Sequence, residues 1–184
     1  EKIPLCKNTL TPNDPSYNSS TQWGLFKINA ANAWNVSTGS PSVVVAVVDD
    51  AVQTNHPDLS TNIWINTGEI PSNGIDDDGN GYIDDVQGYD VADNDNNPNP
   101  PNTTFDHGTH VAGIIGARSN NGVGVASIGY SVKIMAVKST NQATLVTDGY
   151  DGIIYAVNSG ADVINMSWGG SGTSTSAQNI INWA

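Results

Sequence analysis

The stretch Val43-Val44-Val45-Ala46-Val47-Val48-Asp49-Asp50 decides the fold of this chain. It is a continuous, mostly β-branched run without polar alternation, which is typical of a strand buried on both faces of a parallel sheet. The run ends abruptly in two aspartates. Two further apolar runs, at 132–137 and 163–167, predict two more strands of the same kind.

Helical patterns alternate with these strands. Apolar residues recur near helical spacing in four segments, at 23–34, from 107 to a stop at 120–122, at 146–158 and at 177–183. Strands that alternate with helices imply right-handed crossovers and an α/β fold with a parallel sheet.

The chain has 184 residues, which is enough for one domain with a buried core. We expect a tail at 1–10 and part of one domain at 11–184. The domain carries an insertion at about 62–102, rich in Asp, Asn, Gly and Pro, which we expect to be mostly loop.

The composition excludes several classes of function. There are 6 Lys and Arg against 18 Asp and Glu, so the net charge is −12 and phosphate groups of nucleic acid are repelled. The longest apolar stretches are about seven residues, too short to span a bilayer. No basic segment followed by an apolar one opens the sequence, so we expect no signal peptide in it. Cys6 is the single cysteine, so no internal disulfide is expected. The acidic, Lys-poor surface is a compositional hint of a secreted protein.

Polar residues stand where chemistry is expected in such a sheet, beyond the carboxyl ends of the strands. Asp49 and Ser167 both end predicted strands, and His107 starts a helix after a loop. A serine hydrolase needs a base to take the hydroxyl proton and a carboxylate to orient that base. His107 and Asp49 are candidates for these roles if the fold brings them together.

Three motifs together resemble the subtilisin-like serine proteases, or subtilases, and most closely their thermitase-like branch. They are VVVAVVDD with the following NHPDL at 43–59, DHGTHVAG at 106–113, and VINMSWGG at 163–170. The resemblance runs from about residue 11 to the end. It implies a parallel-sheet, three-layer α/β fold, present here as its incomplete N-terminal portion.

The resemblance assigns the catalytic base to His107 and the orienting carboxylate to Asp49. It also implies that Ser167, Trp168 and Gly169 bind a peptide substrate by pairing with it as an added strand. The opposing substrate strand of the family falls at 139–144, which here lacks the usual glycine-rich form.

The pair Asp50-Ala51 departs from the family, in which a small hydroxyl residue and a glycine usually stand. A second carboxylate at this place is expected to perturb the titration of the His–Asp pair. Ala51 is expected to adopt a conformation that glycine usually supplies, with possible strain.

The nucleophilic serine motif and the oxyanion asparagine of the family do not occur in these residues. The segment GTSTSA at 172–177 is similar to the start of the family's serine motif but lacks the proline of that motif. We expect Ser174 or Ser176 to be a helix N-cap instead. We therefore expect this chain alone to lack peptidase activity, and a C-terminal chain or segment to complete the domain. Without that segment, a sheet edge and apolar surface are exposed.

Calcium, at one to three sites, is the expected cofactor because clustered carboxylates need a counter-charge. By resemblance, the strong site of the family comprises the side chains of Asp14, Asp58 and Asn121 and the carbonyls of Arg118, Val123 and Val125. The site of the thermitase-like branch corresponds to Asp90 and Asp95, with Asn97 and Asn99.

A third set lies in the insertion, where alternate acidic positions repeat the ligand spacing of EF-hand loops. Its predicted ligands are Asp76, Asp78, Asn80, the Tyr82 carbonyl and Asp85. The alternative is a solvated acidic loop without a cation.

Three other functions stay open. The chain could be a non-catalytic subtilase-like module that binds peptides, or a calcium-binding structural or adhesion module. The spacing of His107 and His110 also fits a metal pair, but a metal-dependent hydrolase would need a third ligand and usually a Glu. We expect His110 to be a hydrogen-bonded structural residue, and His56 to be structural too.

Overall fold

The computed structural model describes residues 10–171 and 174–184, and its centre is a four-stranded parallel sheet. The strands lie in the order β2-β3-β1-β4, and β1 pairs with both β3 and β4. Asp49 lies opposite Lys138 at the carboxyl ends of β1 and β3. The four strands are β1 (Val44–Asp49), β2 (Gly88–Asp90), β3 (Lys133–Lys138) and β4 (Val163–Asn165).

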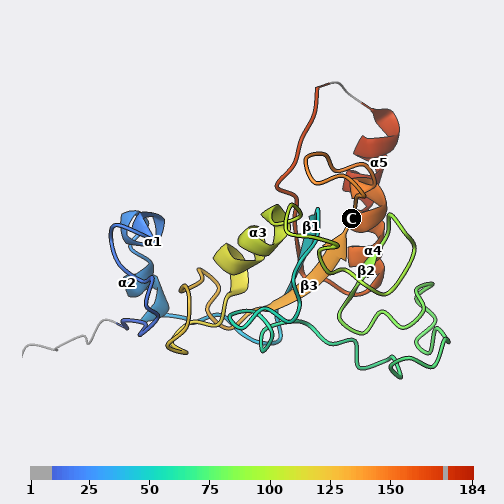
Figure 1. The fold of residues 1–184 in the computed structure, drawn as a ribbon. Coiled ribbons are helices and arrows are strands. Elements are labelled where there is room, and N and C mark those ends of the chain that lie inside the picture. Colours follow the sequence, from blue (N-terminus) through green and yellow to red (C-terminus); the bar gives the residue numbers. More distant parts are fainter. Residues whose placement is uncertain (1–9, 172–173) are drawn as a thin grey trace, which may run out of the picture.

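Two helices cover the two faces of the sheet (Figure 1). α3 (His107–Gly116) packs on the face that carries Val45 and Val47. α4 (Gly149–Asn158) packs on the opposite face, with Ala46 and Val48. The predicted three-layer arrangement is therefore confirmed. α5 (Thr175–Trp183) follows and contacts α4. Among the described residues, none of the helices has the length and apolar character that a membrane span requires.

The N-terminal segment differs from the prediction. Instead of one helix at 23–34, two short helices form, α1 (Trp23–Lys27) and α2 (Ala30–Trp34). They are separated because Asn29 adopts a left-handed conformation with φ of 59°, which an α-helix cannot contain. The buried Trp34 anchors this pair, since its indole N–H donates to the Ile128 carbonyl at 3.1 Å.

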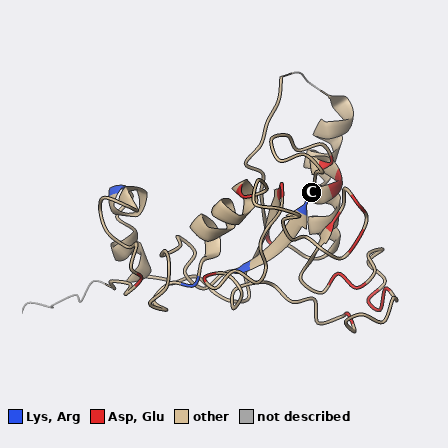
Figure 2. Ribbon diagram, in the orientation of Figure 1, with Lys and Arg blue, Asp and Glu red and all other residues tan. Residues whose placement is uncertain are grey.

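The insertion contains a strand that the sequence did not reveal. β2, at 88–90, adds to the sheet edge beside β3, so this part of the insertion is not loop. Tyr82 and Tyr89 from the insertion pack against Tyr155 of α4, with ring centroids 4.7–5.7 Å apart. In Figure 2 many Asp and Glu positions lie along the loops of this region. The insertion is thus rich in acidic residues and is fixed to the core by aromatic rings.

Candidate active site

Asp49 and His107 meet although 58 residues separate them in the chain. The Nδ1 atom of His107 lies 2.8 Å from Oδ1 of Asp49, which also accepts the backbone N–H of Asp50 at 2.7 Å. An ionised carboxylate can only accept, so Nδ1 carries the proton and Nε2 is left free as a base. Asp49 is 2% exposed and His107 is 54% exposed, so the imidazole faces outward from a buried carboxylate.

The close contact depends on a glycine at the second position of α3. A Cβ atom on Gly108 would lie 2.4 Å from the Ala51 carbonyl oxygen and 2.8 Å from the Asp49 Cβ. Only a glycine lets the helix start approach the end of β1 this closely. The glycine of the DHGTH motif therefore sets the distance between Asp49 and His107.

The two groups influence each other's proton affinity. The hydrogen bond to Asp49 raises the pKa of His107, partial burial opposes this, and the charges of Asp49, Asp50 and Asp106 add to the rise. Burial raises the pKa of Asp49, while the hydrogen bonds from His107 and Asp50 lower it in part. The arrangement stabilises the imidazolium form that a general base acquires when it takes a proton.

Asp50 is a buried carboxylate that binds the start of α3. Its Oδ1 accepts the Gly108 N–H at 2.7 Å, and its Oδ2 accepts the His107 N–H at 3.2 Å. Asp106, the residue before the helix, makes no capping bond with its side chain. The predicted strain at Ala51 is absent, since this residue is not among those with positive φ.

A pocket of about 290 Å³ opens at the Asp49–His107 pair. It is lined by Asp49, Asp50 and His107, by the predicted substrate segment 167–169, and by residues 143–146. The segment after β3, which lacks the glycine-rich form, therefore still forms the opposite wall. Trp168 is fixed there, because its indole N–H donates to the Val48 carbonyl at 2.8 Å and its ring packs edge-on against Tyr150.

Three other polar residues have structural positions. The His56 Nδ1 atom accepts the Asp58 N–H at 3.2 Å, as expected of a structural histidine. His110 is exposed, and its ring makes no hydrogen bond within the described ranges, contrary to the expectation of a bonded residue. The Ser174 hydroxyl accepts the Ala177 N–H at 3.3 Å and is the N-cap of α5, as predicted; residues 172–173 of the GTSTSA segment lie outside the described residues.

The first predicted calcium set is brought together. Asp14 and Asp58 are buried and both face the 118–125 loop. Asp14 accepts the N–H groups of Asn120 and Asn121, at 2.7 and 3.2 Å, and the Asn121 amide lies 2.9 Å from Asp58. No Lys or Arg in the described ranges forms an ion pair with either carboxylate. Two buried carboxylates without a cationic side chain fit a cation at this place.

The rest of the first set lies on the same loop. The backbone N–H of Val125 donates to the Asp58 carboxylate at 2.8 Å, and the backbone N–H of Val123 donates to the Asn121 side chain at 2.8 Å. The backbone N–H of Arg118 donates to the Asp58 carbonyl at 2.8 Å. All six predicted ligand residues therefore belong to one contact region that ties the N-terminal segment to the domain.

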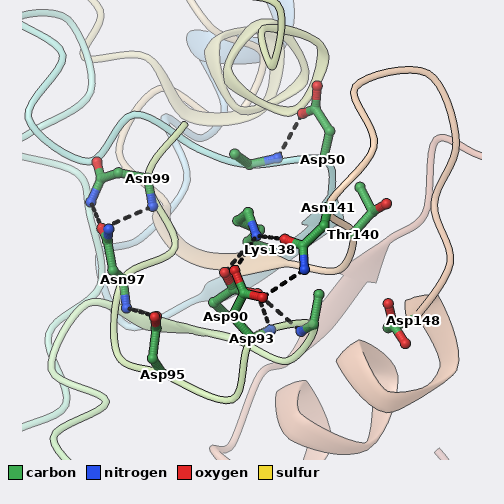
Figure 3. A network of polar contacts seen from close by, with 12 residues as sticks. Asp50, Asp90, Asp93, Asp95, Asn97, Asn99, Lys138, Thr140, Asn141 and Asp148 are labelled. Atoms are coloured by element: carbon green, nitrogen blue, oxygen red, sulfur yellow. Dashed lines mark hydrogen bonds and ion pairs between the residues drawn. The ribbon is translucent and has the colours of Figure 1, made fainter. Parts of the chain in front are cut away.

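The second set does not fit a calcium ion. One oxygen of Asp90 binds the ammonium group of Lys138 at 2.5 Å, and the other accepts the N–H groups of Ala92 and Asp93 (Figure 3). Both Asp90 and Lys138 are 3% exposed. A lysine thus already supplies the positive charge at this carboxylate.

The other members of the second set are turned toward neighbouring amides. Asp95 accepts the N–H of Asn97 at 2.9 Å, and Asn99 accepts the N–H and hydroxyl of Thr54 at 2.9 and 3.1 Å. The amide of Asn99 donates to Asn97 at 3.1 Å. These bonds shape the 95–99 loop without a cation.

The third set is rearranged around a residue that the sequence did not indicate. Carboxylate oxygens of Asp78, Asp85 and Glu69 lie within 4.8 Å of one another. Asn80 joins them by donating to Asp85 at 3.1 Å. In contrast, Asp76 accepts N–H groups of its own loop at 79–81, at 2.7–3.1 Å. The set therefore divides into a three-carboxylate group and a loop-closing aspartate.

Comparisons with known proteins agree with this geometry. Residues 40–184 match the subtilase family, Peptidase_S8, so the chain belongs to the subtilase family. It is 37% identical over 176 residues to thermitase of Thermoactinomyces vulgaris, covering 95% of this chain and 53% of that protein. It is 36% identical to the thermophilic serine proteinase of Bacillus sp. strain AK1, covering 95% of this chain and 37% of that protein.

Solved structures show the same fold. A protease from Pseudoalteromonas arctica PAMC 21717 superposes with a TM-score of 0.70 at 32% identity, over 94% of this chain and 55% of that one. Fervidolysin from Fervidobacterium pennivorans, a keratinolytic enzyme related to subtilisin, superposes with a TM-score of 0.66 at 27% identity, over 99% of this chain and 25% of that one. The chain thus spans about half, or less, of the length of these relatives.

Proposed function

We propose that the complete protein is a subtilisin-like serine endopeptidase and that this chain supplies its acid–base pair. The observation that carries the proposal is the 2.8 Å contact between Asp49 Oδ1 and His107 Nδ1 at the mouth of a pocket. The 167–169 segment, proposed to bind substrate, lines the same pocket. Family membership supports the same reaction class.

In this mechanism the free Nε2 atom of His107 takes the proton of a serine hydroxyl supplied by residues outside this chain. The serine oxygen attacks the peptide carbonyl, and the resulting imidazolium is stabilised by Asp49 and then gives its proton to the leaving amine. Asp49 keeps its charge throughout and holds the imidazole in the productive tautomer. An extended peptide pairs with the backbone of Ser167 and Gly169, beside the Trp168 ring.

Calcium is proposed as the stabilising cofactor, and secretion as the location. Asp14, Asp58 and Asn121 would hold one ion, which supplies charge compensation and fixes the N-terminal segment to the 118–125 loop. The group of Glu69, Asp78 and Asp85 supports a second ion in the insertion. Secretion rests on the acidic, Lys-poor composition alone.

Hydrolysis of an unstructured protein substrate by the complete protein tests the proposal. We expect His107→Ala and Asp49→Asn to lose at least about a thousandfold in kcat, as removal of members of such triads does. His110→Ala is the matched control, because this exposed histidine lies one turn along the same helix, and it should retain activity. Equal activity of wild type and His107→Ala would refute the assignment; a folded but inactive wild type would favour a non-catalytic peptide-binding module.

A further inference from the structure

The carboxylate of Asp50 departs from the family pattern, and it is buried and hydrogen-bonded at the site. Asp50 is 3% exposed, and both of its oxygens accept bonds. Oδ1 accepts the N–H groups of Ala51 and Gly108, both at 2.7 Å, while Oδ2 accepts the N–H of His107 at 3.2 Å. Its own N–H donates to Asp49 at 2.7 Å.

These bonds join the end of β1 to the start of α3. The first N–H groups of a helix have no partner within the helix, and they carry its partial positive charge. A carboxylate that binds two of them forms strong, charge-assisted bonds. The bonded donors include the backbone of His107 itself. Asp50 thus contacts the proposed base through its side chain and Asp49 through its own backbone N–H.

We propose that Asp50 is a positioning residue that fixes His107 onto Asp49 by capping α3 from the neighbouring strand. The inference rests on the proposed acid–base role of His107. Asp50 does not touch substrate in this account. It acts through the backbone of the base and through the N–H that it donates to the orienting carboxylate.

Charge adds a second effect, which a purely structural cap would not have. The titratable groups that face His107 are Asp49 and Asp50 at the end of β1 and Asp106 before α3. The 143–146 and 167–169 segments of the pocket carry no ionisable side chain. The charge of Asp50 contributes to the raised pKa of His107, so its removal should lower that pKa.

Variants of the complete protein separate these effects. Asp50→Ala removes the cap and the charge, Asp50→Asn keeps an acceptor but removes the charge, and Asp50→Ser restores the hydroxyl usual in the family. Asp106→Asn is the matched control, since it removes a neighbouring charge that makes no capping bond.

We expect Asp50→Ala to lower kcat by about tenfold with little change in KM, the loss that corresponds to one misplaced catalytic contact. Asp50→Ser should recover most of kcat. Asp50→Asn and Asp50→Ser should shift the acid limb of kcat/KM to lower pH, while Asp106→Asn should leave kcat within about twofold of wild type. Circular dichroism checks that each variant folds.

NMR titration of the His107 ring provides a readout that does not depend on activity. The pKa of the ring should fall in all three Asp50 variants, and the low-field Nδ1 proton signal should weaken in Asp50→Ala. An unchanged titration and an unchanged kcat in Asp50→Ala would overturn the proposal. If the wild type is inactive, the proposed function fails, and the ring titration still decides the role of Asp50.

Discussion

Replacing Lys138 by Met tests the buried ion pair at the carboxyl end of β3. The ammonium group binds Asp90 at 2.5 Å and the Asn141 side chain at 2.7 Å, and Asp93 lies 3.6 Å away (Figure 3). Methionine keeps most of the apolar stem of the side chain but removes the charge. The Asp90 carboxylate then stays buried without its cation.

The expected cost follows from the burial of both partners. Asp90 and Lys138 are 3% exposed, and breaking such a pair by removing one partner costs about 3–5 kcal/mol. The N–H groups of Ala92 and Asp93 still bind Asp90, which places the expected loss in free energy of unfolding near the lower limit, at about 3 kcal/mol. With an m-value of about 2 kcal/mol/M, the urea midpoint should fall by about 1.5 M.

Urea unfolding at pH 7, followed by circular dichroism, measures this loss. Burial raises the pKa of Asp90 even with Lys138 present, so in Lys138→Met the carboxyl should protonate readily and the deficit should shrink as the pH falls toward 4. The double variant Asp90→Asn with Lys138→Met is the control, since it removes both charges. A cost below about 1 kcal/mol, or a double variant no more stable than the single one, would refute the reasoning.

Three further predictions concern the pocket, the insertion and the pH profile. Gly149→Ala should displace the Trp168 ring, 2.5 Å from the added Cβ, and raise KM of the complete protein severalfold with a smaller effect on kcat; an unchanged KM contradicts this. Tyr155→Phe removes the hydroxyl that donates to buried Asp85 at 2.9 Å and should cost about 1–3 kcal/mol in thermal unfolding, whereas a neutral result means that the bond is not needed. The raised pKa of His107 should place the acid limb of kcat/KM above pH 6.5, because activity falls as the base is protonated; a limb below that pH speaks against the Asp49 contact.

β1, β3 and the Asp49–His107 pair could be predicted because their signals are local. β1 and β3 are continuous apolar runs, and Asp49 and His107 stand in motifs whose residues are adjacent in the sequence. The fold class follows from the alternation of such segments with helical patterns. These features need no knowledge of distant contacts.

Other features were missed because they depend on contacts between distant segments. β2 has three residues inside a polar insertion, and it exists because β3 offers it a partner. Glu69 joins Asp78 and Asp85 only after the insertion folds back. Lys138 directly follows the apolar run 132–137, and a lysine at a buried position needs a carboxylate partner. This signal could have indicated that Asp90 binds a lysine instead of a calcium ion.

Labelling of the complete protein with a serine-reactive fluorophosphonate tests the central claim most directly. We predict that wild type is labelled on a serine outside residues 1–184, and that His107→Ala slows the labelling by at least about a hundredfold while His110→Ala does not. Labelling of wild type and His107→Ala at equal rates would contradict the claim that the Asp49–His107 pair activates the nucleophile. Labelling of Ser174 or Ser176 would contradict the position of the nucleophile.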